Sequence, residues 1–124
     1  MSATILIADD EPNILLSLEF LMQREGYRVL VARDGQEALD AILQHRPDLV
    51  LLDVMMPRKS GFDVLQALRE REDLAAVRVL MLTAKGRDTD MAKGLALGAS
   101  DYMTKPFSTR ELVDKVRSLL EASA

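Results

Sequence analysis

Five polar side chains follow apolar segments of this sequence, in positions where they could meet and carry out chemistry. They are Asp9 and Asp10 after residues 4–8, Asp53 after 48–52, Thr83 after 77–82 and Lys105 after 101–104. A lone aspartate after a strand is usually a turn or helix-cap residue. Four segment ends that together supply three carboxylates, a hydroxyl and an ammonium group instead indicate a functional site, provided that they share one edge of a sheet.

The residue types of this set suit phosphoryl transfer next to an oxygen-bound cation. Clustered carboxylates repel one another and raise each other's pKa unless a cation neutralises them. Oxygen ligands favour a hard ion, and Mg²⁺ binds through one or two carboxylates while it keeps waters and contacts phosphate. A carboxylate can also attack phosphorus and form an aspartyl phosphate, the role we assign to Asp53. Lys105 and Thr83 could then stabilise charge on the phosphoryl oxygens.

The composition limits the class of protein. The 124 residues, of which 48% are hydrophobic, fit one compact domain over residues 1–124. The 16 basic and 20 acidic residues give a net charge of -4, so direct binding to nucleic acid or to an anionic membrane surface is not expected. The lack of cysteine excludes disulfides and thiolate metal sites. Without a secretory signal or an apolar run of membrane-spanning length, a cytoplasmic protein is expected.

Short apolar segments alternate with longer segments of helical period, five of each. We predict strands at residues 4–8, 28–32, 48–52, 77–82 and 101–104. The first, third and fourth are apolar without strict alternation, which is typical of strands buried on both faces. Two pairs spaced as in a capping box, Asp34 with Glu37 and Ser108 with Glu111, predict the starts of the second and fifth helices. The fourth helix contains Gly94 and is the weakest, so any movement is expected there.

The alternation predicts an α/β fold. Five strands joined by helices imply right-handed crossovers and a parallel sheet with helices on both faces. The expected architecture is a doubly wound, flavodoxin-like sheet of five parallel strands flanked by five helices. The strand order 2-1-3-4-5 is adopted because it is a common one for such sheets, whose ligands bind beyond the carboxyl ends of the strands. The five polar side chains would then share one site.

Four motifs, taken in chain order, make the sequence similar to a known family. They are "ADDEP" after the first strand, "LLDVMMP" at the third, "LTA" at the fourth and "DYMTKPF" at the fifth. Together they resemble the response-regulator receiver domain, the phospho-accepting module of two-component signalling, in its chemotaxis-regulator-like form. The resemblance covers essentially the whole chain, and the combination is far more specific than any single motif.

The resemblance implies a role for each matching residue. Asp53 would accept a phosphoryl group from the phosphohistidine of a sensor histidine kinase or a histidine phosphotransfer protein. Asp9 and Asp10 would hold Mg²⁺ together with Asp53, with Asp10 as the direct ligand and Asp9 acting directly or through water. Met55 would supply its backbone carbonyl to the metal. The domain would catalyse only its own phosphorylation and autodephosphorylation, so it is expected to be a signalling domain rather than an enzyme.

The family also implies a switch. Thr83 would hydrogen-bond a phosphoryl oxygen and Lys105 would pair with the phosphoryl group, while the peptide bond from Lys105 to Pro106 would be cis. Tyr102 matches an aromatic residue that turns inward on activation. We expect the surface of the fourth helix, fifth strand and fifth helix to exchange partners with phosphorylation state. That surface would control a downstream protein target or a fused output domain.

Two features depart from the DNA-binding members of this family. Those proteins usually carry an output domain after a linker, whereas this sequence stops at "LLEASA", so a stand-alone receiver and a receiver cut from a longer regulator both fit. Met91 and Ser100 stand where charges of the family's dimerising face are expected. Charges that could still contribute to such a face are Asp101, Glu111, Lys115 and Arg117. A monomer or a weak phosphorylation-dependent dimer is therefore expected.

Three other classes of protein match parts of the pattern. A phosphatase with an aspartyl nucleophile would usually carry a second acid two residues after it, where this chain has Met55. A flavin carrier would need hydroxyls and glycines after the first strand to cradle a phosphate, and "ADDEPN" has acids there. A receiver-like binding module that no longer accepts a phosphoryl group is opposed by the complete set of acids, hydroxyl and lysine.

Individual site residues also have purely structural interpretations. Tyr102 could be a half-buried strand aromatic, Thr83 a helix N-cap and Lys105 a surface lysine. Met55 and Lys85 border the route of a hydrolytic water in the family, so both are expected to tune the lifetime of the phosphoryl group.

Overall fold

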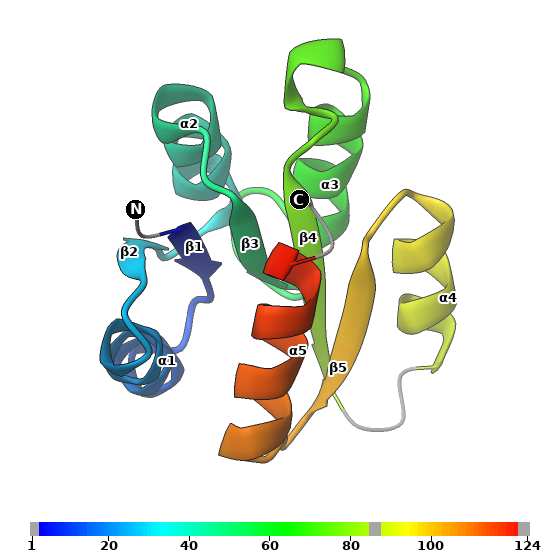
Figure 1. Cartoon of the computed structure of the whole chain (residues 1–124). Helices are drawn as coiled ribbons and strands as arrows, with labels where there is room; N and C mark the ends of the chain where they lie inside the picture. Colours follow the sequence, from blue (N-terminus) through cyan, green and yellow to red (C-terminus); the bar gives the residue numbers. More distant parts are fainter. Residues whose placement is uncertain (1–2, 85–87, 122–124) are drawn as a thin grey trace.

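A computed structural model describes residues 3–84 and 88–121, and these ranges contain five strands alternating with five α-helices (Figure 1). The elements in chain order are β1 (Thr4–Ala8), α1 (Pro12–Arg24), β2 (Arg28–Ala32), α2 (Gly35–His45), β3 (Leu49–Asp53), α3 (Gly61–Arg69), the 3-10 helix η1 (Glu72–Leu74), β4 (Arg78–Ala84), α4 (Asp88–Ala96), β5 (Asp101–Lys105) and α5 (Thr109–Glu121). None of the helices in these ranges is both long enough and apolar enough to cross a membrane. Lys85, one of the two residues expected to tune phosphoryl lifetime, lies outside the described residues.

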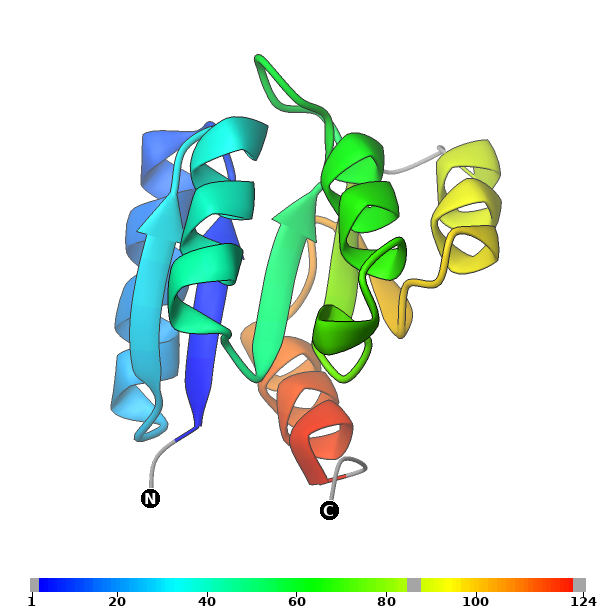
Figure 2. The same ribbon diagram turned by 90° about the horizontal axis from the view of Figure 1, so that it is seen from above.

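All five strands are parallel and follow the order β2-β1-β3-β4-β5. This result confirms the predicted flavodoxin-like topology. Helices α1 and α5 cover one face of the sheet, and α2, α3 and α4 cover the other, as Figure 1 and Figure 2 show from two directions. Because the strands are parallel, their carboxyl ends share one edge, where ligands bind in sheets of this kind.

Each face of the sheet buries its own hydrophobic cluster. In β1, Ile5 and Ile7 pack in the cluster that includes residues of α1 and α5. Leu6 and Ala8 alternate with them and pack in the cluster of α2 and α3. All five residues of β3 are buried. The central strands lack strict alternation because both of their faces are covered, as predicted.

Side chains cap the starts of the second and fifth helices at the predicted positions. Asp34 Oδ1 accepts a hydrogen bond of 2.8 Å from the Glu37 N–H at the start of α2. Ser108 Oγ accepts one of 3.0 Å from the Glu111 N–H at the start of α5. The reciprocal half of the predicted box at α2 differs, because the Glu37 carboxylate accepts from the N–H of Arg33 and not from that of the cap residue.

The strands β3, β4 and β5 extend one or two residues further toward the site than predicted. Asp53, Thr83 and Lys105 therefore belong to these strands and do not merely follow them. The ladder continues because each residue has a partner on the neighbouring strand: Asp53 pairs with Leu82, and Thr83 with Thr104. A polar side chain does not end a strand while backbone donors and acceptors remain available beside it.

Candidate functional site

Three carboxylates converge beyond β1 and β3. Asp9 and Asp10 directly follow β1, and Asp53 is the last residue of β3. One oxygen from each carboxylate lies within 4.8 Å of the others. Asp9 is fully buried, Asp53 is 7% exposed and Asp10 is exposed. The sheet topology thus brings together three acids that lie up to 44 positions apart in the sequence, as the strand-end pattern predicted.

The ammonium group of Lys105 lies between two of these acids. Its Nζ is 2.8 Å from Asp9 Oδ2 and 3.4 Å from Asp53 Oδ1. The other oxygen of Asp9 accepts a 2.9 Å hydrogen bond from the Glu11 N–H, so both oxygens of this buried carboxylate have partners. Burial alone would lower the pKa of Lys105, but the hydrogen bond to Asp9 and the charges of Asp53 and Asp9 outweigh it and raise this pKa.

Asp53 titrates well above an ordinary aspartate. Burial, followed by the negative charge of Asp9, raises its pKa to about 6, and the nearby charge of Lys105 opposes the increase. Burial disfavours the charged form of a carboxyl group because water no longer solvates it. The Asp53 carboxylate is therefore a partly desolvated base, a state that suits a nucleophile or a ligand waiting for a cation.

The backbone of Asp53 is held in place by a glycine at the start of α3. A Cβ on Gly61 would lie 2.3 Å from the carbonyl oxygen of Asp53, so only glycine allows this approach. The Gly61 N–H also donates a 2.9 Å hydrogen bond to the Val54 carbonyl. A reciprocal capping box between Ser60 and Asp63 fixes the start of the helix. The spacing Ser-x-x-Asp was the available signal for this helix start, but the sequence pattern gave no sign of the contact with Asp53.

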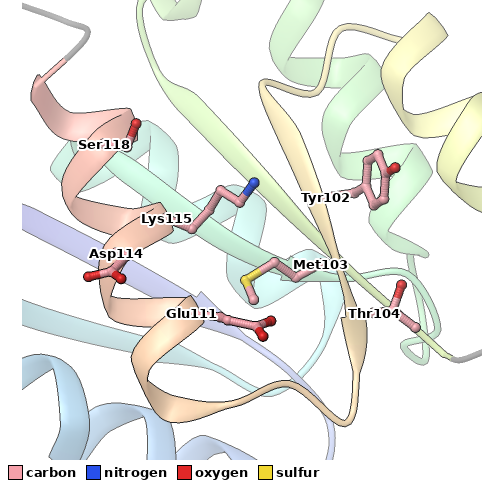
Figure 3. Close-up of a pocket in the computed structure, with 7 residues that line it drawn as sticks. All are labelled: Tyr102, Met103, Thr104, Glu111, Asp114, Lys115 and Ser118. Atoms are coloured by element: carbon pink, nitrogen blue, oxygen red, sulfur yellow. The ribbon is translucent and has the colours of Figure 1, made fainter.

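Thr83 and Tyr102 lie on the adjacent strands β4 and β5. Thr83 is 1% exposed, and its hydroxyl donates a long hydrogen bond of 3.5 Å to the Met103 carbonyl on β5. Thr83 lies inside β4 and is therefore not a helix N-cap. Tyr102 is partly buried on β5, with its ring on the side of the strand away from α5 (Figure 3). It packs against the cluster under α2 and α3.

A pocket of ≈ 250 Å³ opens at this edge of the sheet. Its lining residues are Asp10, Glu11, Asp53, Val54, Met55, Ala84, Asp90 and Lys105. Glu11 and Asp90 were not among the predicted site residues, because nothing in their local sequence separates them from ordinary helix-start acids. Met55 is 61% exposed at the rim, and the peptide bond from Lys105 to Pro106 is cis.

The residues present fit a hard divalent cation. The cluster offers only oxygen atoms, which Mg²⁺ prefers, and has no sulfur or imidazole ligand in the described chain. The three carboxylates place more negative charge in a small volume than one lysine neutralises. A cation bound there would relieve that repulsion.

A second pocket, of ≈ 590 Å³, lies between β5 and α5. Figure 3 shows Met103 and Lys115 pointing into this space, with Glu111 and Asp114 along the helix. The Lys115 ammonium forms a 2.9 Å ion pair with Asp101 of β5. Two of the charges proposed for a dimerising face are thus paired within the chain.

The sequence matches a known family over most of its length. The family model described as response regulator receiver domain matches residues 5–117. The transcriptional regulatory protein CpxR of Escherichia coli strain K12 is 48% identical over 119 residues, which are 96% of this chain and 50% of that protein. The chain therefore spans about half the length of the curated relatives it matches.

Solved structures with substantial sequence identity share the fold. The Francisella response regulator 1452 receiver domain is 32% identical and superimposes with a TM-score of 0.91, covering 99% of this chain and 100% of that one. The chemotaxis response regulator CheY4 of Vibrio cholerae is 31% identical with a TM-score of 0.90, covering 96% of this chain and 99% of that one.

Proposed function

This chain belongs to the response regulator receiver domain family of two-component signalling, and on that premise we propose that it accepts a phosphoryl group on Asp53. One observation carries the proposal. Asp53 is a buried carboxylate whose Oδ1 lies 3.4 Å from the Lys105 ammonium and within 4.8 Å of two further carboxylates. Phosphoryl transfer to a carboxylate needs a nucleophilic carboxylate, a positive side chain beside it and a site for a metal cation. Asp53, Lys105 and the three acids provide these.

The phosphoryl donor is the phosphohistidine of a sensor histidine kinase or a histidine phosphotransfer protein. An oxygen of Asp53 attacks the phosphorus, a P–O bond forms, and the P–N bond to the donor breaks with its electron pair left on the imidazole nitrogen. Because the pKa of Asp53 is about 6, most of the group is ionised and able to attack at pH 7. In autodephosphorylation, water attacks the same phosphorus and the P–O bond to Asp53 breaks, releasing inorganic phosphate.

Mg²⁺ is the proposed cofactor, held by Asp9, Asp10, Asp53 and the backbone carbonyl of Met55. Bound there, it would neutralise the acids and stabilise charge on the phosphoryl oxygens. Both oxygens of Asp9 already accept hydrogen bonds, whereas Asp10 is exposed at the pocket. This difference supports Asp10 as a direct ligand and Asp9 as a ligand through water.

The proposed switch starts from two contacts in this structure: a long hydrogen bond of Thr83, and a Lys105 ammonium group shared between Asp9 and Asp53. The Thr83 hydroxyl would exchange its 3.5 Å hydrogen bond to Met103 for a phosphoryl oxygen. Lys105 would turn from Asp9 toward the phosphoryl group. Because Thr83 and Met103 lie on neighbouring strands, a shift of Thr83 changes the packing next to Tyr102, which would turn inward. A new charge that biases a bistable element is a common basis of such switches.

The output surface is proposed to be the face formed by α4, β5 and α5. Its pocket between β5 and α5 would take part of a downstream protein or of a fused output domain.

The ion pair between Lys115 and Asp101 keeps two surface charges occupied within the chain, which supports a monomer, or a weak dimer that forms on phosphorylation. The net charge of -4 supports the absence of direct nucleic-acid binding. The cytoplasmic location stays a prediction.

The first test is the intact mass of the protein after incubation with acetyl phosphate, with and without Mg²⁺. We expect a Mg²⁺-dependent gain of one phosphoryl group that is lost in Asp53→Asn. The matched control is Asp114→Asn, which removes an exposed carboxylate of α5 and should leave the gain intact. No gain in the unmodified protein, or a gain that survives Asp53→Asn, would contradict the proposal and favour a binding module without phosphoryl chemistry.

A further inference from the structure

Two arginines adopt a backbone conformation that disfavours residues with a Cβ. Among the described residues, Arg46 (φ 47) and Arg58 (φ 69) are the non-glycine positions with positive φ. Arg46 ends α2 as its C-cap, and Arg58 lies in the loop 54–60 that follows Asp53. Positive φ is unfavourable for such residues and is retained only where the surroundings hold it. Each arginine is therefore expected to make a contact that offsets the cost of its positive φ.

Arg58 makes its contact with the N-cap of α2. Asp34 uses Oδ1 to accept from the Glu37 N–H, and its Oδ2 lies 3.5 Å from the Arg58 guanidinium. The Asp34 side chain is 12% exposed, whereas that of Arg58 is 67% exposed. A single, nearly buried carboxylate thus connects the first turn of α2 with the loop after Asp53. This carboxylate plays no part in the chemistry proposed above.

Gly35, the first residue of α2, makes a closer contact with the same loop. A Cβ on Gly35 would lie 2.0 Å from the Lys59 carbonyl oxygen, so the helix start and the loop backbone touch directly. The Gly35 N–H donates to the Pro57 carbonyl at 3.4 Å, and the Lys59 N–H donates to the same oxygen at 2.8 Å. The middle of the loop is therefore fastened to α2, while Gly61 fastens its end to the backbone of Asp53.

We propose that Asp34 and Arg58 are positioning residues that hold the loop 54–60 in the conformation required for cation binding at Asp53. This inference rests on the proposed function, because it concerns the same cation. The loop begins directly after Asp53, and its second residue, Met55, lines the site pocket. When the Arg58 contact is lost, only the backbone contacts of Gly35 still hold the middle of the loop to α2. The loop then moves more easily, and the backbone carbonyl offered to the cation moves with it. Mutation of residues that do not touch the metal but hold one of its ligands in place commonly lowers metal affinity by 10-fold or more.

The test compares Asp34→Asn, Arg58→Asn and the double variant. Asparagine at position 34 keeps an oxygen for the helix cap, and asparagine at position 58 tolerates positive φ, so neither change should prevent folding. The Mg²⁺ dissociation constant is measured on the unphosphorylated protein by NMR titration with MgCl₂. We expect each single change to weaken binding by about 10-fold. The double variant should be no weaker than either single variant, because both remove the same contact.

Arg46 provides the matched control at the other end of α2. It also has a positive φ and also pairs with an aspartate, with its guanidinium 2.8 Å from Asp73. Arg46→Asn should leave the Mg²⁺ dissociation constant unchanged, whatever it does to urea stability. In the metal-free protein, hydrogen exchange at the Lys59 and Gly35 N–H groups should accelerate in Arg58→Asn and not in Arg46→Asn.

The outcomes separate this inference from the function on which it rests. If the unmodified protein binds Mg²⁺ and the Asp34 and Arg58 variants bind it equally well, the positioning role is wrong and the proposed function stands. If all variants, including Arg46→Asn, weaken binding in proportion to lost stability, Asp34 and Arg58 are only structural, and the inference again fails. If the unmodified protein does not bind Mg²⁺, the proposed cation site and this inference are both overturned.

Discussion

Lys105 is bound more closely to Asp9 than to Asp53: its Nζ lies 2.8 Å from Asp9 Oδ2 and 3.4 Å from Asp53 Oδ1. The lysine proposed to pair with the phosphoryl group is thus held at rest by a buried acid that follows another strand, β1. This arrangement leaves the proposed acceptor incompletely compensated, which agrees with its raised pKa. The lysine therefore sets the electrostatic state of Asp53 before any phosphoryl group arrives.

Replacing Lys105 by methionine should raise the pKa of Asp53 further. The lysine charge is the largest of the effects that lower this pKa, so its loss should move the value further above the present value of about 6. The measurement is a ¹³C NMR titration of the aspartate carboxyl carbons in EDTA. Lys115→Met, which removes a lysine paired with Asp101, is the control. An unchanged pKa of Asp53 would show that Lys105 interacts with Asp9 alone.

Asp53→Asn should stabilise the metal-free protein at neutral pH and not in acid. The folded pKa of Asp53 is raised from 3.8 to about 6, so folding is penalised wherever the unfolded chain has lost this proton. The penalty grows as the pH rises from about 4 and is complete above the folded pKa, where it reaches about 3 kcal/mol at most. Asparagine has no such proton to lose.

Urea unfolding followed by circular dichroism in EDTA checks this prediction. Asp53→Asn should exceed the unmodified protein in stability at about pH 7.5 and match it at about pH 4. Added Mg²⁺ should reduce the difference at neutral pH, because only the unmodified site would bind the ion well. A difference that does not vary with pH would mean that the change acts through packing and not through ionisation.

Gly61→Ala should destabilise the protein by about 1–3 kcal/mol, because the new Cβ would overlap the backbone of Asp53 and force the strand or the helix to shift. The phosphoryl gain from acetyl phosphate should fall with it. Gly94→Ala is the matched comparison. Its Cβ would meet the flexible Met81 side chain at 3.3 Å and the Phe62 ring at an ordinary contact distance of 3.8 Å, and alanine favours the helix. Equal loss of urea stability in both variants would argue against a specific role for the Gly61 contact.

Thr83→Ala should retain the phosphoryl gain on Asp53 but weaken its transmission to α4 and β5. The Thr83 hydroxyl lies one strand away from the acceptor and has a replaceable hydrogen bond to Met103. Amide NMR shifts on addition of beryllofluoride, a phosphoryl mimic, measure the effect. The shifts in α4 and β5 should shrink in Thr83→Ala and persist in Thr83→Ser. Thr104→Ala, on the paired strand, is the control, and unaltered shifts in Thr83→Ala would contradict the proposed switch.

Much of the fold and the position of the site could be predicted because they depend on local patterns. The lack of alternation in β1, β3 and β4 indicates strands covered on both faces, and this fixes a parallel sheet between two layers of helices. Parallel strands place their carboxyl ends at one edge, so the convergence of Asp9, Asp10 and Asp53 follows from where the strands end. The predicted strand order was confirmed as well, although it was chosen as a common arrangement and no particular residue specifies it.

Contacts between residues that are distant in the chain could not be predicted. The preference of Lys105 for Asp9 spans 96 positions, and it depends on a small difference between distances of 2.8 Å and 3.4 Å. The contacts of Gly35 with Lys59, and of Arg58 with Asp34, have no periodic signature in either segment. Such distances are set by how the helices and loops pack around the sheet, not by the preference of any one segment.

The sequence by itself determined which chemical groups reach the site, because strand ends and residue types are local properties. The tertiary structure decided how these groups share charge and which backbone segments hold them, since hydrogen bonding, desolvation and steric fit act over a few ångströms between separate elements. The raised pKa of Asp53 is therefore a property of the packed fold, whereas the presence of this acid at the end of β3 is a property of the sequence.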